Sequence, residues 1–180
     1  MAIDVGQIKT KYQAIKNLTV ENYKVNSFKH IIPQIEKGVL YNIITQKVIN
    51  PYTFILTVLS EHKTIEELHI ATYRVSEAAL TNFKYMLDNK LIGNFILLVN
   101  DNYETLMRDK VNILLAMDRE LDNFKLIKKN SHAKITLIKV ADKHLVIQGS
   151  GNYSTNPKIE QYSIMDNEKL YNFHKEWING

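Results

Sequence analysis

Cysteine is absent from the 180-residue chain, and so is any long apolar run. Without cysteine the protein can form no disulfide, cysteine-ligated zinc site or cysteine nucleophile. No apolar stretch approaches the roughly 20 residues that cross a bilayer, and the N-terminus lacks the basic and apolar segments of a signal peptide. We therefore expect a soluble, cytoplasmic protein without a membrane partner.

Internal repeats, low-complexity tracts and long linkers are also missing. The length suits one domain, and a hydrophobic share of 45% is enough for a sizeable core. We expect this domain to span residues 50–180, with residues 1–49 as an N-terminal extension packed on it. Only three residues are arginine, yet the net charge is +4. This excess permits a nucleic-acid partner and fits a lysine-rich solvated surface equally well.

Apolar spacing after Asn50 predicts alternating helices and strands. Pro51 and Ser76 are typical helix-start residues, and a third helix is expected over 103–117. Apolar runs predict strands over 68–75, 95–99, 124–127, 133–140, 144–148 and 159–164. Asp166 is expected to cap a last helix with Leu170, Phe173 and Trp177 on its buried side. The fold class is thus α/β, with a mixed, largely parallel sheet flanked by helices.

The first 49 residues carry weaker signals. Ile8, Tyr12, Ile15 and Leu18 recur at helical spacing, which predicts a helix over residues 5–17. Pro33 argues against a continuous helix through the next stretch. The segment after Gly38 fits either a pair of strands or a short helix.

Between Ser131 and Gln161 the chain gathers groups that can handle a phosphate. His132 and Lys134 are two residues apart, so on a strand their side chains project together. Imidazole can attack phosphorus as a nucleophile, and an ammonium group can neutralise charge that develops on the phosphate oxygens. His132 is therefore the candidate nucleophile, and Lys134 the candidate cation.

A turn and an acid follow in the same stretch. Gly149 and Ser150 allow a close approach of the backbone to phosphate, and the Asn152 amide can donate to its oxygens. A carboxylate on the far ring nitrogen would fix the tautomer of His132, and Glu160 is the candidate. We predict no metal, because the remaining histidines lack ligand spacing with carboxylates, and no cofactor.

The His-x-Lys pair followed by Gly-Ser-x-Asn resembles the signature of the phospholipase D superfamily, over roughly residues 50–180. Small single-motif members of that family tend to be nuclease-like homodimers. The resemblance implies a metal-independent phosphodiesterase that acts through a phosphohistidine, with His132 of a second copy as the acid. The family signature also has Asp seven residues after the histidine, where this chain has Lys139.

Several residues near the motif keep two interpretations. Tyr153 could stack on a base or pack in the core. Arg74 follows a predicted strand, at the end where ligands bind in such sheets, and is a candidate for substrate contact. His69 could face the site, but a satisfied core histidine is favoured. The lysines around the motif could steer phosphate or form a solvated edge.

Two further functions compete with the phosphodiesterase. Lys139 in place of the family acid favours a catalytically inactive nucleic-acid-binding module that keeps the phosphate pocket. A structural protein, for instance of a phage or mobile element, would use residues 1–49 for docking and keep the pocket as a vestige.

Overall fold

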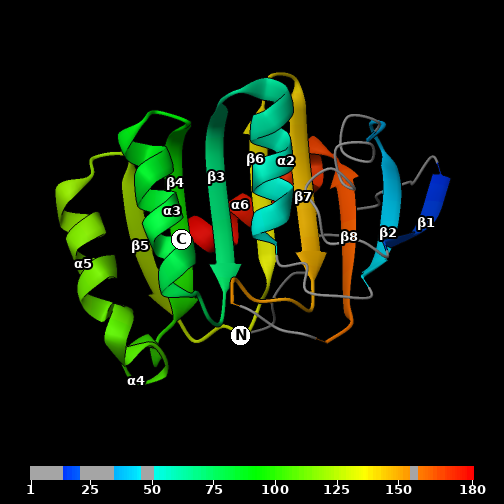
Figure 1. Ribbon diagram of the computed structural model, residues 1–180. Coiled ribbons are helices and arrows are strands. Elements are labelled where there is room, and N and C mark those ends of the chain that lie inside the picture. The colour runs from blue at the N-terminus through cyan, green and yellow to red at the C-terminus, as the bar shows by residue number, and fades with distance from the viewer. Residues whose placement is uncertain (1–13, 21–34, 46–50, 155–157) are drawn as a thin grey trace.

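The computed structural model describes residues 14–20, 35–45, 51–154 and 158–180. Within these ranges the chain forms one mixed sheet with helices on both faces (Figure 1). The elements are β1 (Ala14–Val20), β2 (Val39–Thr45), α2 (Tyr52–His62), β3 (Ile65–Thr72), α3 (Glu77–Asp88), β4 (Ile92–Asn100), α4 (Tyr103–Leu106), η2 (Arg108–Lys110), α5 (Val111–Glu120), β5 (Phe124–Lys129), β6 (Ile135–Val140), β7 (Lys143–Gly149), β8 (Glu160–Asp166) and α6 (Glu168–Asn179).

The described strands follow the order β1-β2-β8-β7-β6-β3-β4-β5. Strands β3, β4 and β5 run parallel to one another, as do β1 and β2, whereas the four pairings from β2 through β8, β7 and β6 to β3 are antiparallel. The expected mixed sheet flanked by helices is confirmed, with a smaller parallel share than the sequence predicts. After β5 the chain has no helical crossover between strands, so its strands pair antiparallel.

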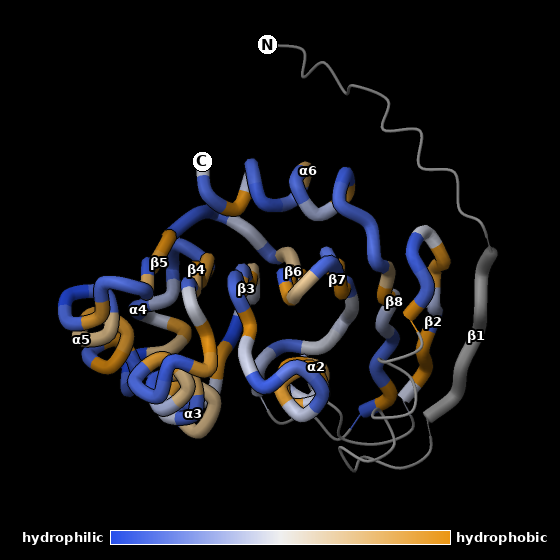
Figure 2. Tube along the Cα trace, turned by 90° about the horizontal axis from the view of Figure 1, so that it is seen from above, coloured by the Kyte–Doolittle hydropathy of each residue, from blue (hydrophilic) through white to orange (hydrophobic). Residues whose placement is uncertain are grey.

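Helices α2, α3 and α5 cover one face of the sheet, and α6 lies across the other (Figure 2). Because side chains alternate along a strand, β3 contributes to both cores. Leu68 and Ile70 pack in the larger core under the three helices, and Ala71 packs in the smaller core under α6. Of the described helices, none is both long and apolar enough to cross a membrane.

The helices confirm some of the predicted boundaries. The Ser76 hydroxyl accepts from the Ala79 N–H at 3.2 Å, so the expected cap of α3 is present. The single helix predicted over 103–117 is divided into α4, η2 and α5. The break lies at Met107, whose φ of −135° is not helical. The buried Met107 sulfur accepts from the Val75 N–H at 3.3 Å, which ties the break to the end of β3.

The last helix differs from its prediction by one residue. Asn167, not Asp166, is the cap, and its side chain accepts from the Leu170 N–H at 2.9 Å. Asp166 ends β8 and accepts from the His144 N–H instead. The predicted buried side is wrong for Phe173, which is 47% exposed, whereas Leu170 and Trp177 are partly buried against the smaller core. The residues that α6 buries are Tyr171, His174 and Ile178.

The described part of the first 49 residues is β-structure. Strand β2 pairs with β8 from Leu40 opposite Met165 to Thr45 opposite Glu160, so the strand alternative holds there. The helix predicted over 5–17 is wrong for residues 14–17, which lie in β1, and residues 5–13 lie outside the described part. The division into an extension and a domain at residue 50 stays a prediction, although β2 belongs to the same sheet.

Candidate active site

Strand register brings the signature residues to one end of the sheet. Ala71, near the end of β3, pairs with Ile135 at the start of β6, and Ile135 also pairs with Gln148 near the end of β7. Gly149 pairs in turn with Tyr162 of β8. The segments that carry His132, the Gly-Ser-x-Asn turn and Arg74 therefore meet beside the carboxyl end of β3, where ligands bind in parallel sheets.

His132 and Lys134 lie just before β6 rather than on it. The segment before β6 is held outside the sheet by two hydrogen bonds. The Asn100 side chain donates to the Ser131 carbonyl at 3.1 Å, and the Ser131 hydroxyl accepts from the Ala133 N–H at 3.2 Å. The two side chains nevertheless meet, with Lys134 Nζ 3.0 Å from His132 Nδ1 and 3.1 Å from the His132 carbonyl oxygen.

This contact determines which nitrogen of a neutral His132 ring carries the proton. A lysine ammonium can only donate, so Nδ1 must accept, and a neutral ring then carries its proton on Nε2. An imidazole attacks through its unprotonated nitrogen. In this arrangement Nδ1 is occupied by Lys134 and Nε2 is protonated. Burial lowers the pKa of Lys134 and the nearby Glu160 carboxylate opposes that shift, with a net decrease.

The Gly-Ser-x-Asn turn is bonded into the sheet on both sides. The Gly149 N–H donates to the Lys134 carbonyl at 3.2 Å, and the Ser150 N–H donates to the Gln161 carbonyl at 3.0 Å. The Ser150 hydroxyl accepts from the Gln161 N–H and donates to the Glu160 carboxylate. Two backbone donors predicted to face a phosphate therefore serve the sheet, and their role is to hold the turn in place.

Tyr162 explains why glycine occupies two positions of this turn. A Cβ on Gly149 would lie 2.6 Å from the Gln161 carbonyl oxygen and would overlap the Tyr162 ring. A Cβ on Gly151 would overlap the Tyr162 hydroxyl. A shallow depression that is partly open to solvent lies beside these two glycines, Tyr162 and Lys134, and it has no enclosed space that would hold a water molecule. The turn therefore closes tightly on the sheet beside the Lys134 side chain.

Asn152 joins this turn to the end of β3. Its Oδ1 accepts from the Arg74 N–H at 3.3 Å and from the Thr72 hydroxyl at 3.4 Å. Because a backbone N–H can only donate, the amide oxygen must face β3, and the Asn152 NH₂ group points away from it. The amide is thus oriented with its donor end available, as a contact with phosphate oxygens requires.

The remaining predicted site residues lie in contrasting settings. The Tyr153 ring is 2% exposed and packs on Phe83, and its hydroxyl lies 2.5 Å from the Thr136 hydroxyl. Packing, the alternative interpretation, is therefore what the structure shows for Tyr153. Arg74 is exposed at the end of β3, where a substrate could reach it.

The structure does not bring Glu160 to His132. Glu160 is 5% exposed and accepts from the Ser150 hydroxyl. Among the described residues, the hydrogen bonds of the His132 ring go to Lys134. The expected carboxylate–imidazole bond is therefore not part of this arrangement, and the Glu160 charge acts on Lys134.

Tyr73 is the residue near the site that sequence reasoning missed. Its ring lies 4.5 Å from that of His132, centroid to centroid, at an interplanar angle of 44°. The Arg74 guanidinium lies 5.9 Å from the centroid of the same Tyr73 ring. A signal was present, since Tyr73 lies near the carboxyl end of the strand predicted over 68–75, where ligands bind, but the family signature does not include this position.

Lys139 occupies the position of the family acid and lies at the other end of β6. Its Nζ is 3.1 Å from Glu66 Oε2. At about 3.3 Å per residue, the offset of five residues from Lys134 to Lys139 spans roughly 15 Å or more. Lys139 is thus part of a charged pair with β3 and not of the site around His132.

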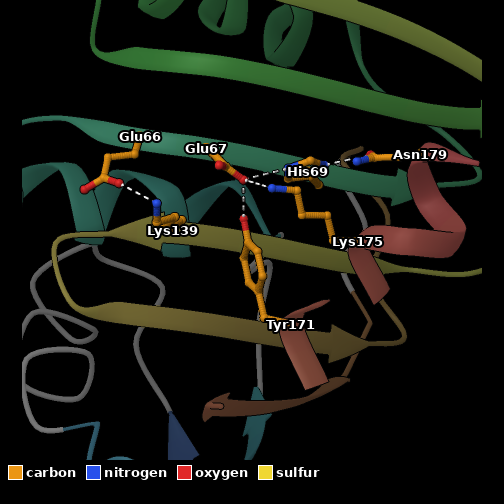
Figure 3. A network of polar contacts seen from close by, with 7 residues as sticks. All are labelled: Glu66, Glu67, His69, Lys139, Tyr171, Lys175 and Asn179. Atoms are coloured by element: carbon orange, nitrogen blue, oxygen red, sulfur yellow. Dashed lines mark hydrogen bonds and ion pairs between the residues drawn. The ribbon is translucent and has the colours of Figure 1, made fainter. Parts of the chain in front are cut away.

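His69 belongs to a polar network on the face that α6 covers (Figure 3). Glu67 Oε2 accepts from Lys175 at 2.5 Å, from the Tyr171 hydroxyl at 3.2 Å and from His69 Nε2 at 3.3 Å. The other ring nitrogen of His69, Nδ1, lies 3.1 Å from the side-chain amide of Asn179 and accepts from it when the ring is neutral. His69 is therefore a satisfied core histidine, and we call these five residues the Glu67 network.

Potential metal ligands are not gathered anywhere in the described part of the chain. Within those ranges, no group of three or more histidine, aspartate or glutamate side chains is arranged to hold an ion. His132 has Lys134 as its polar neighbour, and a cation beside a ring nitrogen opposes the binding of a second cation there.

The sheet order and its helical layers define a phospholipase D-like fold, as the sequence motif predicts. Among solved structures, the chain is similar to polyphosphate kinase from Porphyromonas gingivalis, with a TM-score of 0.54 and 14% identity over 77% of this chain and 25% of that one. It also matches phosphatidylserine synthase from Haemophilus influenzae Rd KW20, with a TM-score of 0.49 and 11% identity over 78% of this chain and 37% of that one.

Comparisons of the sequence alone find no match, although a solved structure has a similar fold. No family model matches the chain, and no curated protein does. The chain spans a quarter of the polyphosphate kinase and little more than a third of the phosphatidylserine synthase. At these identities the similarity shows the fold alone, and the function has to be argued from the residues of the site.

Proposed function

We propose that the protein is a metal-independent phosphodiesterase with His132 as its nucleophile. The observation that carries this proposal is the meeting of His132 and Lys134 with the Gly-Ser-x-Asn turn at one end of the sheet. Nucleic acid is the substrate class that we favour, because the chain has a net charge of +4 and Arg74 is exposed beside the site.

Substrate binding would prepare the nucleophile. A phosphate bound at the surface beside His132 would attract the Lys134 ammonium, because a phosphate oxygen accepts more strongly than a neutral imidazole nitrogen. Nδ1 would then be free to take the ring proton through solvent, which leaves Nε2 unprotonated for attack. Lys134 and the NH₂ group of Asn152 would bind the non-bridging oxygens, where charge develops in the transition state.

The reaction would proceed in two displacements. His132 Nε2 forms a bond to phosphorus, and the bond from phosphorus to the leaving oxygen breaks. The leaving oxygen takes a proton from His132 of a second copy, which is why we propose a homodimer. Water then attacks the phosphohistidine, gives its proton to that second imidazole and releases a phosphomonoester.

Hydrolysis in EDTA tests this proposal. Wild type, His132→Ala and the control His62→Ala would be assayed on bis-p-nitrophenyl phosphate, single-stranded DNA and RNA. His62 lies at the end of α2 and keeps the number of histidines equal between the variants. We expect activity in wild type and His62→Ala, and none above background in His132→Ala. Equal rates in all three proteins, or no hydrolysis of any substrate, would contradict it.

A second function is favoured by the bonds of the site as they stand. Lys134 occupies Nδ1 of His132, and the Glu160 carboxylate is bonded to Ser150. A site with these bonds can hold a phosphate without attacking it, as an inactive nucleic-acid-binding module would. This alternative predicts binding of labelled DNA in EDTA that weakens steeply with salt and occurs without cleavage. Lack of binding at low salt would contradict it.

A further inference from the structure

His132 has few contacts that could fix the direction of its ring. It is exposed, and it lies in an irregular segment rather than on a strand. The hydrogen-bond and ring contacts of its side chain within the described chain are the Lys134 ammonium at one ring nitrogen and the Tyr73 ring at 4.5 Å. The mechanism above requires Lys134 to move to the phosphate. During the reaction, Tyr73 is therefore the contact that remains.

Tyr73 is suited to this task because its backbone is held on both sides. Before it, the Thr72 hydroxyl donates to the Arg74 carbonyl at 3.0 Å. After it, the Arg74 N–H donates to Asn152 Oδ1, and the Tyr153 N–H donates to the Arg74 carbonyl at 3.1 Å. These bonds join the end of β3 to the Gly-Ser-x-Asn turn. An aromatic ring on a segment held in this way restricts the orientations that a neighbouring ring can adopt.

We infer that Tyr73 is a positioning residue that sets the direction of the His132 ring and keeps Nε2 aimed at the phosphate. The inference rests on the proposed phosphodiesterase function. It also gives Asn152 a second role, because the Asn152 amide oxygen holds the segment that carries Tyr73. The ring contact, and not the Tyr73 hydroxyl, provides the positioning. Phenylalanine should therefore replace tyrosine, whereas a residue without a ring should not.

Kinetics on bis-p-nitrophenyl phosphate in EDTA separate positioning from substrate binding. We expect Tyr73→Ala to lower kcat about 10–100-fold with KM within about twofold, because misorientation of a reacting group costs that much in rate. Tyr73→Phe should keep kcat within about threefold of wild type. Tyr85→Ala, which removes a tyrosine 62% exposed on α3, is the matched control and should leave both constants unchanged. An unchanged kcat in Tyr73→Ala would overturn the inference.

The same variants exclude a base-stacking role. If Tyr73 instead stacks on a nucleobase, Tyr73→Ala would raise KM for single-stranded DNA and leave bis-p-nitrophenyl phosphate unaffected. That result would overturn the inference too. A loss of kcat in Tyr73→Phe equal to that in Tyr73→Ala would likewise overturn it, because it would assign the effect to the hydroxyl.

Proton NMR of the histidine ring provides a readout that does not depend on activity. The His132 ring resonances, assigned by their loss in His132→Gln, should show a ring-current shift in wild type and Tyr73→Phe that disappears in Tyr73→Leu. Absence of the shift in wild type would overturn the inference. Its presence in a protein that hydrolyses no diester would contradict the proposed function while leaving the positioning contact intact.

Discussion

The His132 region and the Glu67 network contain the same kinds of group in opposite settings. Each combines a histidine with a lysine, and a carboxylate acts on each of these lysines. His69 is 3% exposed, and both of its ring nitrogens have partners in the fold. His132 is exposed, bonds to a lysine at one ring nitrogen and lies 4.5 Å from an aromatic ring.

The two regions differ in how much their polar contacts stabilise the fold. Removing charges from water is costly, so a half-buried charge is paired in the fold, as Glu67 is with Lys175 and His69. The contact between Lys134 and His132 joins a cation to an imidazole ring at the surface, where water can solvate both groups. It therefore adds little stability to the fold.

The largest contrast is expected between the two lysines. Lys134→Met should lower kcat for a phosphodiester about 10²–10³-fold, because it removes a cation from the developing charge. Lys175→Met should leave kcat unchanged and lower the free energy of unfolding, because Glu67 then loses its cationic partner. Steady-state kinetics and urea unfolding of both variants measure the contrast. Comparable loss of kcat in both variants would remove the distinction between the two regions.

A second contrast concerns the half-buried carboxylate of Glu67. Glu67→Gln keeps the shape and removes the charge that Lys175, His69 and Tyr171 share. We expect a loss of about 2 kcal/mol in the free energy of unfolding, typical of a hydrogen-bonded charge. Glu66→Gln is the matched control, since Glu66 forms an exposed pair with Lys139 worth at most about 1 kcal/mol. Equal destabilisation by both substitutions in urea would contradict a stabilising role of the Glu67 network.

The sequence predicts an element of the fold correctly where the residues of that element alone determine it. The Ser76 cap and the apolar run of β4 are local, and the structure contains both. The break at Met107 was not readable, because its sulfur accepts from the distant Val75 N–H. The antiparallel pairings of the sheet were not predictable for the same reason, since strand pairing depends on contacts between residues far apart in the chain.

The sequence predicts which residues form the candidate site better than it predicts their hydrogen-bond partners. The motif identified His132, Lys134 and Asn152, and strand register brings them to one end of the sheet. It did not indicate that Lys134 would take the Nδ1 position or that Glu160 would bond to Ser150. Side-chain partners of this kind depend on sub-ångström placement of loops, which residue types and spacing do not encode.

Acid should destabilise the α6 side of the protein before it affects the signature end. Burial lowers the pKa of His69 and of His174, and Trp177 Nε1–H donates to His174 Nδ1 at 2.9 Å, which requires a neutral ring. The unfolded chain therefore binds protons on these imidazoles more readily, near an ordinary pKa of about 6.5. Their contribution to stability is present above about pH 6.5 and is lost as the pH falls below it.

Each of these two histidines can contribute a slope of up to about 1.4 kcal/mol per pH unit. Glu67 acts in the same direction at lower pH. Its burial raises the pKa, but Lys175 and His69 outweigh that shift and leave it below the ordinary value. Urea unfolding between pH 7.5 and 5.5 should show a smaller slope in His69→Gln than in wild type. An equal slope in the two proteins would contradict this contribution of His69.

The smallest effect is expected where the chain departs from the family signature. Lys139→Asp restores the family acid, yet it should restore no activity, because position 139 lies roughly 15 Å along β6 from Lys134. Lys139 pairs with Glu66, which raises the lysine pKa, and an aspartate there would face Glu66 and the nearby Glu67 with like charge. We therefore expect a slight loss of stability, strongest at low salt, and an unchanged kcat. Lys139→Met is the matched control, since it removes the pair without adding repulsion. An increase of kcat in Lys139→Asp alone would show that the acid acts on His132 across the strand, and the separation of the two regions would then fail.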